Sequence, residues 1–86
     1  MTAAEKLMDA GYDDVIIFSD YSYDDALIGV STDGQAIYDY DKMIAWLVDT
    51  QGFTYEEAHD WVQYNTIRSL DYMENGPIIM YALEEE

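Results

Sequence analysis

The sequence predicts a single α+β domain of two layers, with helices packed on one face of a mostly antiparallel sheet of three or four strands. Two capping boxes, an Asp-Gly dipeptide between runs of β-forming residues, and apolar residues at helical spacing indicate this class. The expected order of elements is α-β-β-β-α-α-β. Residues 1–83 are expected to form the domain, and residues 84–86 an acidic C-terminal tail.

The N-terminal region is expected to supply one helix and one strand. Thr2 and Glu5 have the spacing of a capping box, and Gly11 suits the left-handed position that follows a helix. The β-forming run Val-Ile-Ile-Phe at 15–18 then predicts a strand that is buried on both faces. A polar, aromatic loop at 19–25 follows this strand.

A β-hairpin is predicted from two strands at 26–31 and 35–40, because Asp33-Gly34 favours a tight turn with positive φ angles. A two-residue loop would pair Val30 with Ile37. The aliphatic side chains of the hairpin would then face inward: Ile28, Val30 and Ile37. The opposite face, which carries two tyrosines, would be at least partly exposed to water: Tyr38 and Tyr40.

The C-terminal half predicts two helices and a last strand. One helix is expected at 41–51, and a second capping box at Thr54 and Glu57 begins another at 55–69. Their short connection predicts an antiparallel helical hairpin. The run 77–83 reads as a strand whose isoleucine-rich start favours a fairly central place, with proline first, where no ladder donor is needed.

The composition is strongly acidic. The 86 residues include 19 Asp and Glu but only 3 Lys and Arg, for a net charge of -16. Like charges would repel DNA, RNA and anionic membranes, so direct binding to these is not expected. Half of the residues are apolar, which favours a folded chain over a disordered one. Solubility needs a net charge of only about 2–8 in magnitude, so the excess calls for a functional reason.

Catalysis and metal binding have little support in the sequence. The chain has no Cys, one His (His59) and no nucleophile-elbow motif, so a non-enzyme without a cofactor is expected. The acidic loop could attract hard cations through Asp20, Asp24 and Asp25, but no EF-hand pattern is present. A divalent-cation-dependent domain is therefore kept only as a third hypothesis.

Tyrosines alternate with aspartates in two stretches of the chain. Carboxylates pair with Arg and Lys, and tyrosine rings receive guanidinium planes, so this pattern suits a binder of a basic protein. The expected partner-binding residues are Asp20, Tyr21, Tyr23, Asp24, Asp25, Asp39, Tyr40 and Asp41. The total charge matches that of a DNA duplex of similar length, but evenly spread it would be about threefold too dilute. Mimicry of nucleic acid therefore requires the acids to gather on one face.

Four segments carry a resemblance to a known group of proteins: 38–43, 55–58, 64–68 and 77–81. They resemble small acidic, largely uncharacterised proteins of phages and mobile elements in gut Firmicutes. In size, charge and lack of Cys, the chain is also similar to anti-CRISPR and antirestriction DNA mimics, without a shared motif. Together these resemblances imply a bacterial or phage protein of the host cytoplasm that interferes with a nucleic-acid-handling enzyme.

The leading hypothesis is a non-enzymatic inhibitor that occupies the basic nucleic-acid-binding groove of a defence protein, for example a CRISPR effector. The alternative is a small structural or regulatory interaction module that does not mimic nucleic acid. Such a module could form a homodimer through an exposed strand and the tyrosine face of the hairpin. Neither hypothesis involves a membrane.

Overall fold

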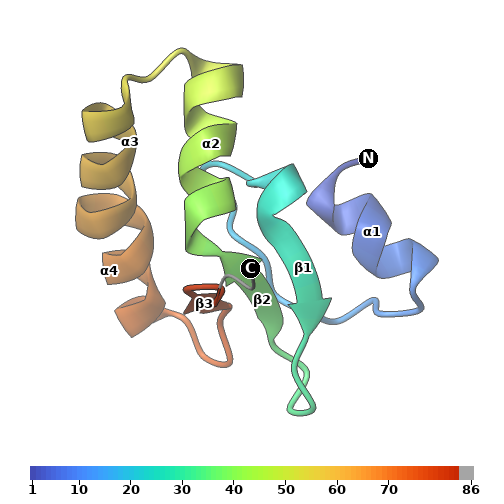
Figure 1. Cartoon of the computed structure of the whole chain (residues 1–86). Coiled ribbons are helices and arrows are strands. Elements are labelled where there is room, and N and C mark those ends of the chain that lie inside the picture. The colour runs from blue at the N-terminus through green and yellow to red at the C-terminus, as the bar shows by residue number, and fades with distance from the viewer. Residues whose placement is uncertain (84–86) are drawn as a thin grey trace.

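A three-stranded mixed sheet lies at the centre of the computed structural model, which describes residues 1–83 (Figure 1). The strand order is β1 (Leu27–Val30), β2 (Ala36–Asp39) and β3 (Ile78–Met80), with β2 in the middle. The α+β class is confirmed. The sheet is not mostly antiparallel, however, because β1 and β2 are antiparallel whereas β2 and β3 are parallel. The expected acidic tail at 84–86 lies outside the described residues.

The parallel pair follows from the helices that connect its strands. The chain leaves β2 through α2 (Tyr40–Gln51), returns through α3 (Tyr55–Trp61) and α4 (Ile67–Ser69), and then enters β3. Figure 1 shows α2 beside the α3–α4 helix, next to the sheet. A parallel strand needs such a crossover. β3 has β2 as its neighbour and lies at the edge of this sheet, so the expected central place is wrong.

The predicted strand at 15–18 is absent from the described part of the chain, so the order α-β-β-β-α-α-β is also wrong. The segment has no strand assignment, and only one side of it is covered. Val15 and Ile17 pack against the core, whereas Ile16 is 40% exposed. Phe18 is buried, with its ring 4.9 Å from that of Tyr38. The apolar side chains are thus used for packing onto the domain and not for a sheet ladder.

The hairpin forms, but with a longer loop than predicted. Val30 pairs with Ala36 and not with Ile37, and the Ser31 N–H donates to the Gln35 carbonyl at 2.7 Å. The loop therefore has three residues and ends at Gly34, whose φ of +83° suits glycine. Such a one-residue shift exchanges the faces of a strand.

The inner face of the hairpin differs from the predicted one at Ile28 and Ile37, whereas Val30 packs against the core as predicted, because the pairing is irregular between Leu27 and Gly29. Tyr38 is fully buried and Tyr40 is 3% exposed, whereas Ile28 is 45% exposed and Val30 and Ile37 are only partly buried. The aromatic side of the hairpin faces the core. The expected wet tyrosine face is therefore wrong for this structure.

Both predicted capping boxes are present. In α1 (Ala3–Asp9), the Thr2 N–H donates to Glu5 Oε1 at 2.9 Å, and the Glu5 N–H donates back to Thr2 Oγ1 at 3.1 Å. Thr54 and Glu57 form the same pair of hydrogen bonds at the start of α3. These reciprocal bonds satisfy amides that have no partner inside the helix.

The helix that begins at Tyr55 contains one wide turn. Between α3 and α4, residues Val62–Thr66 form a π-helical turn, in which the Ile67 N–H donates to the Val62 carbonyl five residues earlier. In this turn Thr66 is buried, while Asn65, which the helical periodicity placed on the apolar face, is exposed. π-turns of this kind are rare and occur frequently at functional sites.

Candidate partner-binding site

The tyrosines of the 19–25 loop belong mainly to an aromatic core. The ring centroid of Tyr21 lies 6.0 Å from Trp46, 6.0 Å from Phe53 and 5.4 Å from Trp61. Tyr23 is 1% exposed and lies 5.5 Å from Trp46. The loop is thus packed onto α2 and α3. Two tyrosines that were expected to contact a partner instead fill the interior of the domain, Tyr21 partly and Tyr23 fully.

Tyr23 is fixed by a hydrogen bond and by an unusual backbone conformation. Its hydroxyl lies 2.6 Å from Oγ1 of Thr66 in the π-helical turn, and its φ is +47°. Positive φ is uncommon for a bulky residue and costs free energy, so packing must hold it there. Burial raises the pKa of the Tyr23 phenol to about 12. Burial likewise raises the pKa of Tyr38 to about 12.

Two of the predicted acidic contacts stabilise the fold. Asp24 Oδ1 accepts a 2.7 Å hydrogen bond from the Ala3 N–H at the start of α1. Asp39 is 6% exposed and caps α2 by accepting from the Lys42 N–H at 3.2 Å. Carboxylates at helix N-termini satisfy free amides and oppose the helix dipole. One oxygen of each of these two carboxylates therefore accepts a hydrogen bond from within the protein.

Tyr40 is also an interior residue. Its hydroxyl lies 2.8 Å from Nδ1 of His59 and accepts from the side-chain amide of Gln63 at 3.1 Å. His59 is consequently half-buried and hydrogen-bonded, and not a freely solvated surface residue as the helical pattern suggested. The predicted contact residues that remain exposed are three acids: Asp20, Asp25 and Asp41.

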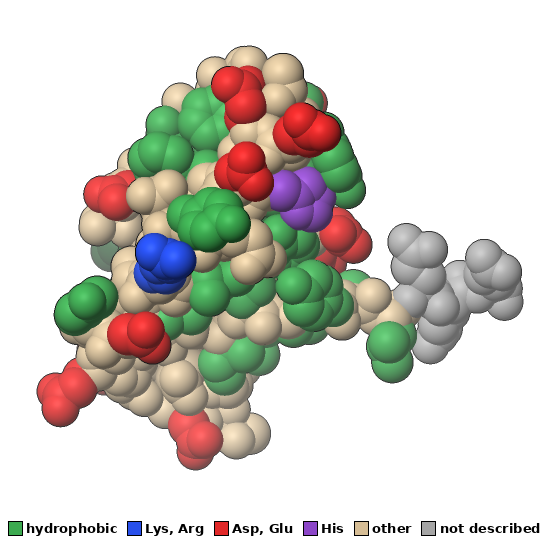
Figure 2. Space-filling view, turned by 90° about the vertical axis from the view of Figure 1, so that its left-hand side faces the viewer, with side chains coloured by type: hydrophobic (Ala, Val, Ile, Leu, Met, Phe, Trp, Pro, Cys, Tyr) green, Lys and Arg blue, Asp and Glu red, His purple; other side chains and the backbone are tan. Residues whose placement is uncertain are grey.

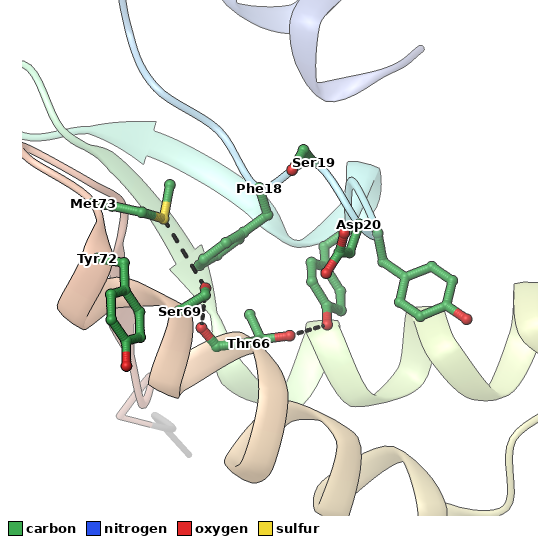
Figure 3. A pocket seen from close by; sticks show the side chains of 9 residues that line it. Phe18, Ser19, Asp20, Thr66, Ser69, Tyr72 and Met73 are labelled. Carbon is green, nitrogen blue, oxygen red and sulfur yellow. Dashed lines mark hydrogen bonds between the residues drawn. The ribbon is translucent and has the colours of Figure 1, made fainter.

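A pocket brings together three of the predicted residues, namely Asp20, Tyr21 and Tyr23. It lies between the 18–23 segment and the helix that runs from the π-turn through α4, and its volume is about 250 Å³ (Figure 3). We call it the Tyr23 pocket. It is lined by Phe18, Ser19, Asp20, Tyr21, Tyr23, Thr66, Ser69, Tyr72 and Met73. Asp41 lies elsewhere, in a groove beside Tyr55.

A second aromatic and acidic region was not anticipated from the sequence. We call it the α3 face, and its residues are all exposed: Glu56, Glu57, Asp60 and Tyr64. A hollow on this helix combines Glu57 and Asp60 with Trp61 and Tyr64. The capping box was the feature of the sequence that could have indicated this region. It begins a helix whose first turn carries acids and whose apolar residues face inward.

Of the cations of the chain, Arg68 lies on this surface against Tyr64, whereas Lys6 is used elsewhere in the fold. Lys6 Nζ donates to the backbone carbonyls of Asp24 and Leu27, and the guanidinium carbon of Arg68 lies 5.2 Å from the ring centroid of Tyr64. The backbone hydrogen bond from the capping box holds the pKa of Glu57 below its ordinary value. Figure 2 shows acidic side chains gathered near the histidine in the upper part of this side of the molecule, others scattered toward its edges, and a cationic side chain beside the central hydrophobic area.

Other classes of site find no support in the part of the chain that the structure describes. Within residues 1–83, no three His, Cys, Asp or Glu side chains are grouped so that they could hold a metal ion. None of the helices formed by these residues is long and apolar enough to cross a membrane. Comparison of the chain with family models, with curated proteins and with solved structures found no match.

Proposed function

We propose that this protein is a non-enzymatic acidic binding protein whose α3 face docks on a basic, nucleic-acid-binding surface of another protein. The observation that carries this proposal is the combination, on one side of the helix, of exposed carboxylates with the rings of Trp61 and Tyr64. A guanidinium or ammonium group can pair with the carboxylates while its alkyl stem or its plane covers a ring.

The distribution of charge favours local competition over imitation of a whole duplex. A net charge of -16 over 5800 Å² of accessible surface has roughly one third of the charge density of duplex DNA. On the side seen in Figure 2, the acids gather near the histidine and are sparse over the rest of the view. The protein would therefore cover a few phosphate-binding side chains of its partner, and long-range attraction would mainly speed association.

The partner class rests on the resemblances in size, charge and sequence segments described above. These favour a phage or mobile-element protein that acts in the bacterial cytoplasm on a defence enzyme such as a CRISPR effector or a restriction endonuclease. In this proposal the protein does not bind nucleic acid itself. It displaces nucleic acid from the basic groove of the enzyme.

A competition experiment tests the proposal. A labelled duplex is bound to a purified CRISPR effector or restriction endonuclease, and the protein is titrated in while fluorescence anisotropy is followed at low and at high salt. We expect displacement at low salt that weakens steeply as salt rises. A small basic protein without a nucleic-acid groove serves as the control partner and should bind far more weakly.

Matched variants locate the docking face. Glu56→Gln with Asp60→Asn removes two charges from the α3 face, and Asp9→Asn with Asp13→Asn removes two exposed charges elsewhere. The first pair should weaken displacement about tenfold more than the second, because charge-assisted hydrogen bonds are lost in addition to net charge. Equal weakening would reject the α3 face, and displacement that is absent or insensitive to salt would reject the proposed function.

One observation favours a second candidate function, a homodimeric interaction module. β1 is an edge strand in the described sheet, with Ile28 exposed beside an apolar groove that α1 and β1 line together. Exposed edges can pair with a second copy, although the Lys6 ammonium at the Leu27 carbonyl opposes this. Sedimentation velocity at two protein concentrations separates the two candidate functions. A protein that is monomeric at both concentrations cannot be a homodimeric module.

A further inference from the structure

We infer that the Tyr23 pocket binds an arginine side chain of the partner protein. This inference rests on the proposed function, because it assumes a basic partner, and it names the group that the partner would insert. The pocket shares no lining residue with the hollow of the α3 face. It is built from two segments that are distant in the sequence, 18–23 and 66–73.

The polar groups of the pocket include acceptors for a cation, namely one carboxylate and several hydroxyl oxygens. The Ser69 hydroxyl donates to the Thr66 carbonyl at 2.6 Å, so its oxygen is left to accept. The hydroxyls of Tyr23 and Thr66 share one hydrogen bond of 2.6 Å, which uses one of their two protons. Asp20 adds an exposed carboxylate at the same pocket (Figure 3). A guanidinium has five donors and no acceptor, so it matches this set.

The walls of the pocket suit the rest of an arginine side chain. Phe18 and Met73 offer apolar surface for the methylene stem, and Tyr21 and Tyr72, which also line the pocket, provide rings on which a guanidinium plane could stack. None of the residues that line the pocket is Lys, Arg or His. The local field is therefore negative and favours a cation.

Two local irregularities of the backbone form the pocket. Tyr23, at φ +47°, turns its ring toward the helix, and the π-helical turn brings Thr66 within 2.6 Å of the Tyr23 hydroxyl. Regular backbone at both places would be less costly, and unusual conformations of this kind are kept where surrounding structure or function requires them. The site is thus held in place before any ligand binds, which limits the entropy cost of binding.

Peptide titration followed by amide NMR tests the inference with the intact protein. The probe is an acetylated and amidated glycine-serine pentapeptide with a central arginine. Two further peptides carry lysine or citrulline at the centre. We expect the arginine peptide to shift the resonances of 18–23 and 66–73 with a dissociation constant of about 1 mM. Citrulline has a similar shape but no charge and should bind at least about tenfold more weakly.

A pair of variants supplies the matched control. Asp20→Asn removes the carboxylate that lines the pocket, whereas Asp25→Asn removes an exposed carboxylate nearby in the sequence that does not line it. Each variant removes one negative charge, so the two change the net charge equally. Both residues are exposed, so both variants should fold. Asp20→Asn should weaken binding of the arginine peptide about tenfold, and Asp25→Asn less than about twofold.

Three results would overturn the inference: equal binding of the arginine and citrulline peptides, binding of the lysine peptide as tight as that of arginine, or equal effects of the two variants with shifts scattered over the surface. The last result would leave the proposed function standing, because general attraction of cations would remain. Conversely, pocket-specific arginine binding without displacement of nucleic acid in the competition experiment would support the pocket and reject the proposed function.

Discussion

The 20–25 segment and the α3 face contain the same kinds of residue but use them in opposite ways. In the 20–25 segment, Tyr23 is in the core and Asp24 holds the start of α1. On the α3 face, Tyr64 is 60% exposed, and the acids of the same face are also exposed to solvent. Tyrosine and acid close together in the sequence therefore lie on an exposed surface in one region and belong to the core in the other.

The difference lies in what surrounds each segment. The 20–25 segment has no regular hydrogen-bonded ladder and is held by its side chains, so the rings must pack against Trp46, Phe53 and Trp61. The α3 helix satisfies its own backbone and needs only one apolar stripe for packing, which leaves its other side free. A segment without regular structure is thus more dependent on its aromatic residues than a helix is.

The comparison predicts its largest effect for Tyr23→Ala. Truncation of this buried ring should lower the free energy of unfolding by about 3–5 kcal/mol, through lost burial and a residual cavity. Tyr64→Ala should cost less than about 1 kcal/mol, since only an exposed contact with Arg68 is lost. Urea denaturation followed by circular dichroism measures both.

Tyr23→Phe keeps the prediction testable if the alanine variant does not fold. This change removes only the hydroxyl that bonds Thr66, and it should cost about 1 kcal/mol. Similar losses for Tyr23→Ala and Tyr64→Ala would show that the two regions are not different in the way described.

The second prediction concerns alkaline pH, which should destabilise the interior region that contains Tyr23 and Tyr38. Burial raises the pKa of Tyr23 and Tyr38 from 10.0 to about 12. The folded state thus holds these protons more tightly than the unfolded state. The contribution of these two protonated groups to the free energy of unfolding is fully present below pH 10 and declines as pH rises from 10 to 12.

A tyrosinate absorbance titration together with circular dichroism checks this expectation. Tyr23 and Tyr38 should ionise only near pH 12 or together with unfolding. Tyr38→Phe should remove one late-titrating group. Ionisation of all nine tyrosines in a single step with the fold intact would contradict the assignment of these two to the interior.

The smallest expected effect distinguishes a buried acid from an exposed one. Asp39→Ala removes the N-cap of α2 and should cost about 1 kcal/mol. Asp25→Ala should change stability by less than about 0.5 kcal/mol, because Asp25 is exposed. Thermal unfolding at fixed salt compares the two, since both variants remove one negative charge. Equal changes would mean that net charge, and not capping, governs the result.

Local signals in the sequence predicted local structure well. Each capping box depends on two side chains three residues apart, so Thr2 with Glu5 and Thr54 with Glu57 were predictable without knowledge of the fold. The hairpin was predictable from Asp33-Gly34, but its register was not, because the loop length depends on which face of the strands the core accepts.

The errors came from features that depend on distant parts of the chain. Segment 15–18 has the composition of a buried strand, yet no neighbouring strand pairs with it and its packing is one-sided. The Tyr23 pocket needs the π-helical turn and the positive φ of Tyr23 at the same time, and no residue pattern in either segment indicates the other. Exposure of Tyr55 and Tyr64 follows from the inward stripe of their helix and was the more predictable part of the site.

The mixed sheet also has a consequence for the order in which the domain can assemble. β1 and β2 join across a three-residue loop, which costs little chain entropy to close. Ile37 and Ile78, by contrast, lie on either side of the whole helical hairpin in the sequence, so pairing of β2 with β3 closes a much longer stretch of chain. We therefore expect the last strand to complete the sheet after the helices have brought it back beside β2.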